Sequence, residues 1–203
     1  MLRHLRRRRS LWAALALSLA AVPTMFAGTA AAPAESGDPQ VPEPEENPTA
    51  LLPPDPAELE RAHLMAQAEL IADLAPEKYR MLVVETAERH GVDPRLVAAV
   101  ITVESRWDPD AVGAHGELGL MQILPSTGEW LADVMDLNEY DLSDPETSLE
   151  MGTFYLAALI QEYGSPDVAL AVYNGGPRAA EDWQSNPYRA KVLAAYRAPD
   201  LVS

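Results

Sequence analysis

The chain has 203 residues, of which 48% are hydrophobic, with no cysteine and a formal net charge of −16. This length suits one domain with appended segments, and the lack of cysteine excludes disulfides, thiolate zinc sites and cysteine nucleophiles. The acidic balance argues against nucleic acid and anionic membranes as partners, because both attract basic proteins.

Residues 1–32 have the composition of an export signal. A basic start with five arginines is followed by an apolar run, Leu11 to Val22, and by small residues, Gly28 to Ala32. The run is short for a membrane span but has the length of a signal-peptide core. We therefore expect an exported protein, periplasmic or extracellular, with no membrane span after signal removal. An uncleaved anchor is the alternative.

Residues 33–56 are predicted to be a disordered linker, because they hold eight prolines and several acidic residues but almost nothing to bury. Residues 57–203 are predicted to form one domain, with its core in residues 76–196.

The domain is predicted to be all-α, because helix start signals follow one another and no alternating strand pattern occurs. Most starts are Asp, Ser or Asn before proline, the residues preferred at the N-cap and first helical positions. The predicted starts are Asp55-Pro56, Pro76, Asp93-Pro94, Pro125, Asp144-Pro145, Ser165-Pro166 and Asn186-Pro187. The helix from Ser165 is predicted to stop before Asn174. The first helix is predicted to have a partial apolar face, formed by Leu59, His63, Leu70, Ile71 and Leu74.

The helix that begins at Pro94 is apolar on every side from Leu96 to Val103. A helix without a polar face is buried among others, so we expect it to be the centre of the domain. Residues 105–118 are predicted to be a loop, and residues 118–124 are compatible with a small extended or β element.

Glu104 is predicted to lie in the last turn of this central helix. The negative end of the helix dipole, the free carbonyl groups and an apolar wall all disfavour an ionised carboxylate there. We therefore expect a raised pKa, which suits a general acid that protonates a glycosidic oxygen. The alternative is a solvated glutamate that pairs with Arg106.

Several ordered motifs surround Glu104. They read Glu104-Ser105-Arg106-Trp107-Asp108-Pro109-Asp110-Ala111-Val112-Gly113, Gly116-Glu117-Leu118-Gly119-Leu120-Met121-Gln122-Ile123-Leu124-Pro125-Ser126-Thr127, Gly152-Thr153-Phe154-Tyr155-Leu156 and Ala169-Leu170-Ala171-Val172-Tyr173-Asn174-Gly175-Gly176-Pro177. Together they resemble the lytic transglycosylase family with a goose-lysozyme-like catalytic domain, the SLT domain. The resemblance covers roughly residues 76–196 and implies a lysozyme-like helical fold.

Carried over residue by residue, the resemblance implies that Glu104 is the catalytic acid and base. The substrate-binding residues it implies are Ser105, Met121, Gln122, Tyr173 and Asn174. Amides and phenols suit N-acetyl sugars, because they donate and accept hydrogen bonds without adding charge. Tyr155 is interpreted first as a core residue, and His115 is a further candidate for a substrate contact.

The implied reaction is cleavage of the β-1,4 bond between N-acetylmuramic acid and N-acetylglucosamine in peptidoglycan, with a 1,6-anhydro product. It needs one carboxylate and no metal or organic cofactor. Two alternatives stay open. One is a lysozyme-type muramidase that uses water, with Asp108 or Asp110 as a base. The other is a non-catalytic glycan-binding or scaffold protein.

The sequence departs from the family pattern at three positions. Gly113 stands where serine is frequent, Glu117 replaces a small residue, and Gln184 stands where glutamate is frequent. We expect Glu117 to shift the pH optimum, because it adds a charge near the site.

Overall fold

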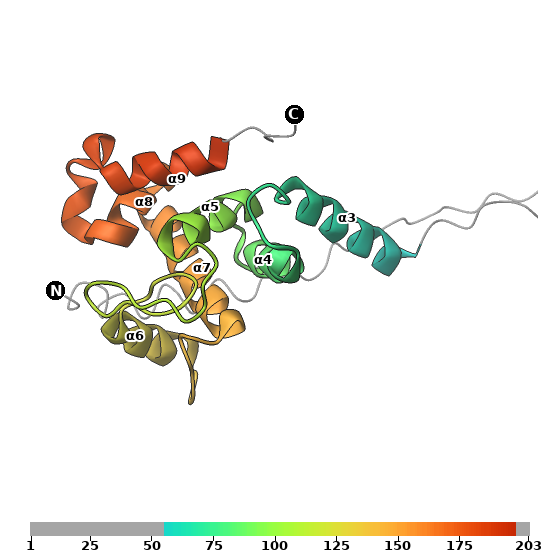
Figure 1. The fold of residues 1–203 in the computed structure, drawn as a ribbon, viewed down its shortest axis with the longest axis horizontal. Coiled ribbons are helices and arrows are strands. Elements are labelled where there is room, and N and C mark those ends of the chain that lie inside the picture. Colours follow the sequence, from blue (N-terminus) through green and yellow to red (C-terminus); the bar gives the residue numbers. More distant parts are fainter. Residues whose placement is uncertain (1–54, 198–203) are drawn as a thin grey trace, which may run out of the picture. The chain divides into compact units, whose positions relative to one another are not determined.

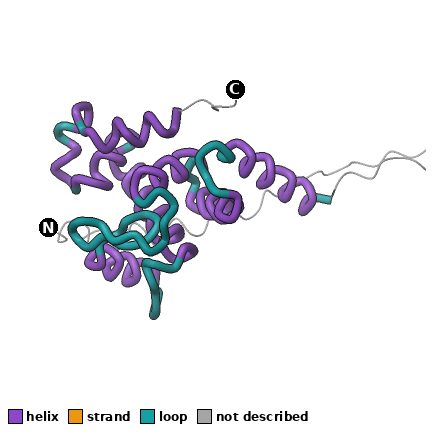
Figure 2. Tube along the Cα trace, in the orientation of Figure 1, coloured by secondary structure: helices purple, strands orange, loops and turns teal. Residues whose placement is uncertain are grey.

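The computed structural model describes residues 55–197, which form helices joined by loops (Figure 1). The helices are α3 (Pro56–Leu70), α4 (Glu77–His90), α5 (Pro94–Glu104), α6 (Pro125–Met135), α7 (Pro145–Tyr163), α8 (Pro166–Gly175) and α9 (Pro187–Arg197), with short 3-10 helices η1 (Pro177–Ala180) and η2 (Trp183–Ser185). Within this range no strand is present (Figure 2), which confirms the all-α prediction.

Two predicted segments fall largely beyond these residues. The export signal, residues 1–32, lies outside the described residues, and so does nearly all of the linker, residues 33–56. The last two residues of that linker, Asp55 and Pro56, instead cap and begin α3. None of the helices between residues 55 and 197 is long and apolar enough to cross a membrane.

Side-chain caps fix the helix starts, as the sequence predicts. The side chains of Asp55, Asp93, Asp144 and Ser165 each accept a hydrogen bond from a backbone N–H of the first turn. These bonds satisfy donors that have no partner within the helix. One predicted end is wrong: α8 continues through Gly175, because the Gly176 N–H still donates to the carbonyl of Val172 at 2.7 Å.

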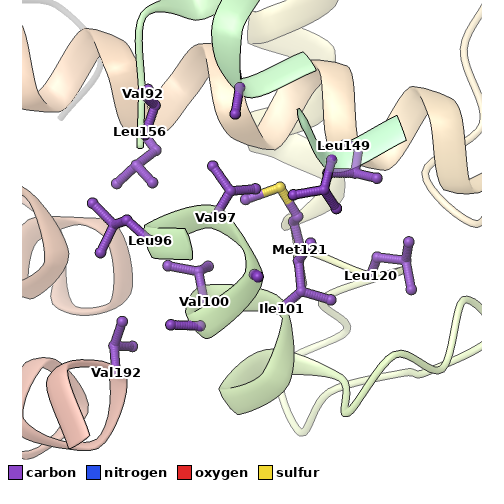
Figure 3. Close-up of a cluster of buried hydrophobic side chains, with 14 of the residues drawn as sticks. Val92, Leu96, Val97, Val100, Ile101, Leu120, Met121, Leu149, Leu156 and Val192 are labelled. Atoms are coloured by element: carbon purple, nitrogen blue, oxygen red, sulfur yellow. The ribbon is translucent and has the colours of Figure 1, made fainter. Parts of the chain in front are cut away.

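The helix α5 is the centre of the domain, as its all-apolar surface predicts. Every residue from Leu96 to Ile101 is buried. Figure 3 shows side chains of this helix in one buried cluster with Leu149 and Leu156 of α7 and Val192 of α9. Because α5 is packed on several sides, its C-terminal end is held in a fixed position for the residues that follow.

The apolar face predicted for α3 is only partly correct. Leu59 and Leu70 are 55% and 63% exposed, and His63 is exposed and binds Glu88 of α4. The helix packs on α4, and its buried contacts come from Ala68 and from Ile71, which follows the last turn. The apolar pattern of α3 alone could not show which side meets α4.

The segment between α5 and α6 is a long loop (Figure 2). In place of the extended element expected near residues 118–124 it has two isolated antiparallel bridges, Val112 with Leu118 and Leu118 with Ile123. Leu118 and Ile123 exchange two backbone hydrogen bonds of 3.0 Å. The Ser105 hydroxyl donates to the Leu120 carbonyl at 2.8 Å, and Leu120 and Met121 are fully buried. These contacts anchor the loop to the end of α5.

Gly152 of α7 allows this anchored loop to approach the helix closely. A Cβ atom at position 152 would lie 2.5 Å from the Met121 sulfur and 2.7 Å from Met121 Cβ. Such distances are shorter than van der Waals contact, so a larger residue would force Met121 out of its place.

We expect Gly152→Ala to lower the free energy of unfolding by about 1–3 kcal/mol, although alanine favours helices intrinsically. Urea unfolding followed by circular dichroism measures the change. Gln161→Ala, at an exposed position of α7, is the control and should stay within about 0.5 kcal/mol. A Gly152→Ala protein as stable as the wild type would contradict this account of the packing.

Candidate active site

A cavity of about 350 Å³ opens at the end of α5. Its wall combines carboxylates, amides and phenols from α5, the long loop and α6 to α8. The lining residues are Glu104, Gly113, Ala114, His115, Glu117, Gln122, Ile123, Leu124, Thr127, Tyr155, Tyr173, Asn174 and Gly176. Residues 70 positions apart in the chain therefore share one site.

Glu104 is the last residue of α5 and lies in this wall. The Tyr188 hydroxyl donates a hydrogen bond of 2.7 Å to Glu104 Oε1. Burial raises the pKa of Glu104 from 4.5 to about 7, against the lowering effect of the Tyr188 bond, and the nearby Glu117 charge adds to the rise. The expected rise in pKa is confirmed. The alternative pairing with Arg106 is not what the structure has, since Arg106 is exposed and Tyr188 is the partner.

Tyr188 is a site residue that the sequence analysis missed. It lies in the first turn of α9 and is 8% exposed. Two signals mark it in the sequence: its place just after the helix start at Asn186-Pro187, and its match to a tyrosine of the family pattern, four residues after Gln184. Neither signal says that α9 packs against the end of α5.

Tyr173 and Tyr155 form an aromatic side of the cavity. Their ring centroids are 5.4 Å apart, and Tyr155 also packs edge-on against Trp130. The Tyr173 hydroxyl donates to the Met121 carbonyl at 2.9 Å. Burial, followed by the Glu104 charge, raises the Tyr173 pKa well above its usual value, so this phenol stays neutral. Tyr155, which the sequence favours first as a core residue, packs against the core and also lines the cavity.

Gln122 reaches the cavity from a left-handed backbone conformation, with φ of 48°. This conformation is uncommon for residues other than glycine and is kept only where the surroundings enforce it. The Gln122 side-chain amide donates to the carbonyls of Ala111 and Gly119, both at 3.0 Å. The loop therefore fixes Gln122 in place, whereas Asn174, which also lines the cavity, is exposed.

Ser105 and Met121 are predicted substrate contacts whose side chains do not line the cavity. The Ser105 hydroxyl donates to Leu120 and accepts from the Trp107 N–H at 3.2 Å. Met121 is fully buried, and its sulfur accepts a hydrogen bond of 3.7 Å from the Thr153 hydroxyl. Their contacts are those of residues that hold the loop in place.

Of the three departures from the family pattern, two line the cavity and one does not. Gly113 and Glu117 line it, together with His115, whereas Gln184 is exposed on η2. Asp108 and Asp110, the two candidate bases, are exposed and lie outside the lining. Across residues 55–197, no group of three His, Cys, Asp or Glu side chains is placed to hold a metal ion.

Comparison with known proteins decides the family. The family model described as "Transglycosylase SLT domain" matches residues 81–195. The chain belongs to this family. The match includes Glu104, the loop with Gln122, and Tyr188, so the site described above lies within the family's domain.

Two curated relatives show how much of a protein the similarity covers. The soluble lytic murein transglycosylase of Salmonella typhimurium is 30% identical over 116 residues, which is 55% of this chain and 18% of the relative. The transglycosylase of Enterobacteria phage PRD1 is 34% identical over 107 residues, or 52% of this chain and 38% of the relative. The chain thus spans less than half the length of these relatives.

Solved structures confirm the fold. An inactive variant of lytic transglycosylase Slt from Pseudomonas aeruginosa matches with a TM-score of 0.54 and 22% identity, over 67% of this chain and 30% of that one. The 70 kDa soluble lytic transglycosylase from Escherichia coli matches with a TM-score of 0.51 and 24% identity, over 69% and 29%. The fold is therefore the lysozyme-like helical fold of this SLT domain.

We expect Tyr188→Phe to raise the pKa of Glu104 above about 7. The phenol donates a hydrogen bond to the ionised carboxylate and so lowers the pKa of Glu104. Without this donor, the effect of burial, which raises the pKa, is no longer opposed. A pH titration of the Glu104 side-chain carboxyl by carbon NMR measures the value. Tyr196→Phe, also on α9 but bonded to Asp93, is the control. A lower pKa in Tyr188→Phe would contradict this assignment.

The raised pKa of Glu104 also makes stability depend on pH. Between pH 4.5 and about 7 the folded state keeps a proton that the unfolded state releases, so stability falls as the pH rises. Glutamine cannot ionise. We expect the free energy of unfolding of Glu104→Gln, taken relative to that of the wild type, to rise by up to about 3 kcal/mol between acidic and mildly alkaline pH. Urea unfolding at several pH values tests this, with Glu85→Gln, at an exposed position of α4, as the control.

Proposed function

We propose that this protein is an exported peptidoglycan lytic transglycosylase. The observation that carries the proposal is a glutamic acid with a pKa of about 7, placed in the wall of a cavity lined by amides and phenols. A general acid works best when its pKa lies close to the working pH. The curated relatives bear the names of lytic murein transglycosylases, which agrees with the site.

The proposed reaction uses Glu104 twice. Protonated Glu104 gives its proton to the oxygen between N-acetylmuramic acid and N-acetylglucosamine, and the bond from muramic C1 to that oxygen breaks. The muramic C6 hydroxyl oxygen then bonds to C1, while its proton passes to the Glu104 carboxylate. The acid is restored, no water is consumed, and the product has a 1,6-anhydro ring.

The surroundings of Glu104 support this double role. Burial favours the acid form, and the hydrogen bond of 2.7 Å from the Tyr188 hydroxyl stabilises the carboxylate form. The two effects hold the carboxyl near neutrality, so that it can give and regain a proton. Gln122 and Asn174 line the cavity and provide the neutral hydrogen-bonding groups that suit N-acetyl sugars.

The proposed compartment follows from the substrate. Peptidoglycan lies outside the cytoplasm, so the export segment predicted in residues 1–32 would bring the enzyme to it. Glycan strands are the proposed partner, and the acidic charge of −16 makes nucleic acid an unfavourable one.

The test is digestion of purified peptidoglycan, followed by mass spectrometry of the released products. We expect products lighter by one water than reducing muropeptides, and we expect Glu104→Gln to lower the rate about a hundredfold or more. Asp108→Asn and Asp110→Asn should cleave at nearly the wild-type rate.

Each alternative has its own signature in this assay. Reducing ends would establish a muramidase that uses water. Binding of glycan without any cleavage would establish a non-catalytic protein. A Glu104→Gln enzyme as fast as the wild type would refute Glu104 as the acid.

A further inference from the structure

Glu117 is a second carboxylate in the cavity, and the proposed reaction does not use it. It lies in the loop before Gly119, and its side chain is 23% exposed. The side chain is thus partly shielded from water, and hydrogen-bond donors of the loop stabilise its charge.

The backbone of the loop provides that support. The His115 N–H donates to Glu117 Oε2 at 2.9 Å, and His115 Nδ1 lies 3.2 Å from Glu117 Oε1. The Gly113 N–H also donates to the Glu117 carbonyl at 2.8 Å. The residue is thus fixed by both its main chain and its side chain.

Gly113 leaves room for the carboxylate. A Cβ atom at position 113 would overlap Glu117 Oε2 and would lie 2.7 Å from Gln122 Oε1. The glycine and the glutamate are therefore complementary: the Glu117 carboxylate fills the space that a side chain at position 113 would occupy, next to Gln122 in the cavity wall.

Hydrogen bonding by its own loop does not saturate Glu117. An ionised carboxylate has about four acceptor positions; His115 provides one partner to each oxygen, and the backbone N–H of Glu117 itself adds a third. Because Glu117 lines the cavity, its other acceptor positions are available to a bound sugar. The neighbouring basic group, His115, is 83% exposed on its side chain, so solvent weakens its compensation of the charge.

We propose that Glu117 sets the charge preference of the cavity, by binding a sugar unit whose C2 carries a free, protonated amine, as in glucosamine, more tightly than the acetylated unit. An ammonium group gives three donors and a full positive charge, whereas an acetamide gives one neutral donor. This inference rests on the proposal that the cavity binds glycan, and it adds the class of sugar that is favoured.

The ionisation of the site agrees with this preference. Hydrogen bonds of the Glu117 backbone and, after them, of His115 lower the Glu117 pKa, while burial raises that of Glu104 to about 7. In mildly acidic solution Glu104 is therefore neutral and Glu117 is charged. Under those conditions Glu117 is the carboxylate that attracts a cationic sugar.

The experiment is calorimetric titration in mildly acidic buffer with two probes, short β-1,4-linked oligomers of glucosamine and their fully N-acetylated counterparts. We expect the wild type to bind the glucosamine oligomers more tightly. Glu117→Gln should lower that affinity at least about tenfold and leave the acetylated probe nearly unchanged. Asp110→Asn, a loop carboxylate outside the cavity lining, is the matched control and should keep the preference.

Gly113→Ala provides a second, independent variant. It leaves every charge in place but crowds the Glu117 carboxylate and, less closely, Gln122 Oε1, so it should reproduce the loss seen in Glu117→Gln. Thermal unfolding of each variant shows whether it is folded. A glucosamine preference that survives in both folded variants, or is absent from the wild type, overturns the inference.

The outcome can be separated from that of the proposed function. A wild-type protein that binds glucosamine oligomers through Glu117 but releases no anhydro product from peptidoglycan supports this inference and refutes the lytic activity. Anhydro products together with equal affinity for both probes support the activity and overturn the inference.

Discussion

The burial of one carboxyl group at the end of a buried helix is the constraint on which the site depends. Glu104 ends a helix in which six consecutive residues, Leu96 to Ile101, are buried, and burial is the largest cause of its raised pKa. A helix packed on several sides holds its end in place, so the carboxyl stays in the cavity wall and cannot move out into bulk water. The packing of α5 therefore decides the proton affinity of Glu104, and local charges only adjust it.

Two neighbours adjust that affinity in opposite directions. Tyr188 donates to the carboxylate and lowers the pKa, whereas the negative charge of Glu117 raises it. The two residues come from different parts of the chain, one from α9 and the other from the loop after α5. The proton affinity of the acid therefore depends on the fold of the whole domain.

The loop between α5 and α6 is anchored to the packed helices and forms part of the cavity wall. Ser105 and Met121 tie it to the core, through the Leu120 carbonyl and the contact with Gly152. The loop presents Glu117 to the cavity between these anchors, and Gln122 directly after the second one. Residues that hold the loop and residues that line the site thus alternate along one stretch, which explains why a sequence motif includes both kinds without distinguishing them.

The sequence by itself determined the helix starts, the central place of α5 and the position of Glu104 at its end. These features depend on short-range interactions: a capping side chain lies within three residues of the N–H that it binds, and an all-apolar helix must be buried wherever it packs. The family motifs also indicated Gln122, Tyr173 and Asn174, all of which line the cavity.

Only the tertiary structure decided that Tyr188 is the partner of Glu104, that Glu117 enters the cavity while Ser105 and Met121 do not, and that α3 leaves Leu59 and Leu70 exposed. Each of these facts depends on how elements far apart in the chain dock on one another. Docking is set by the summed packing of many side chains, and no local pattern records which face of a helix or loop will meet which neighbour.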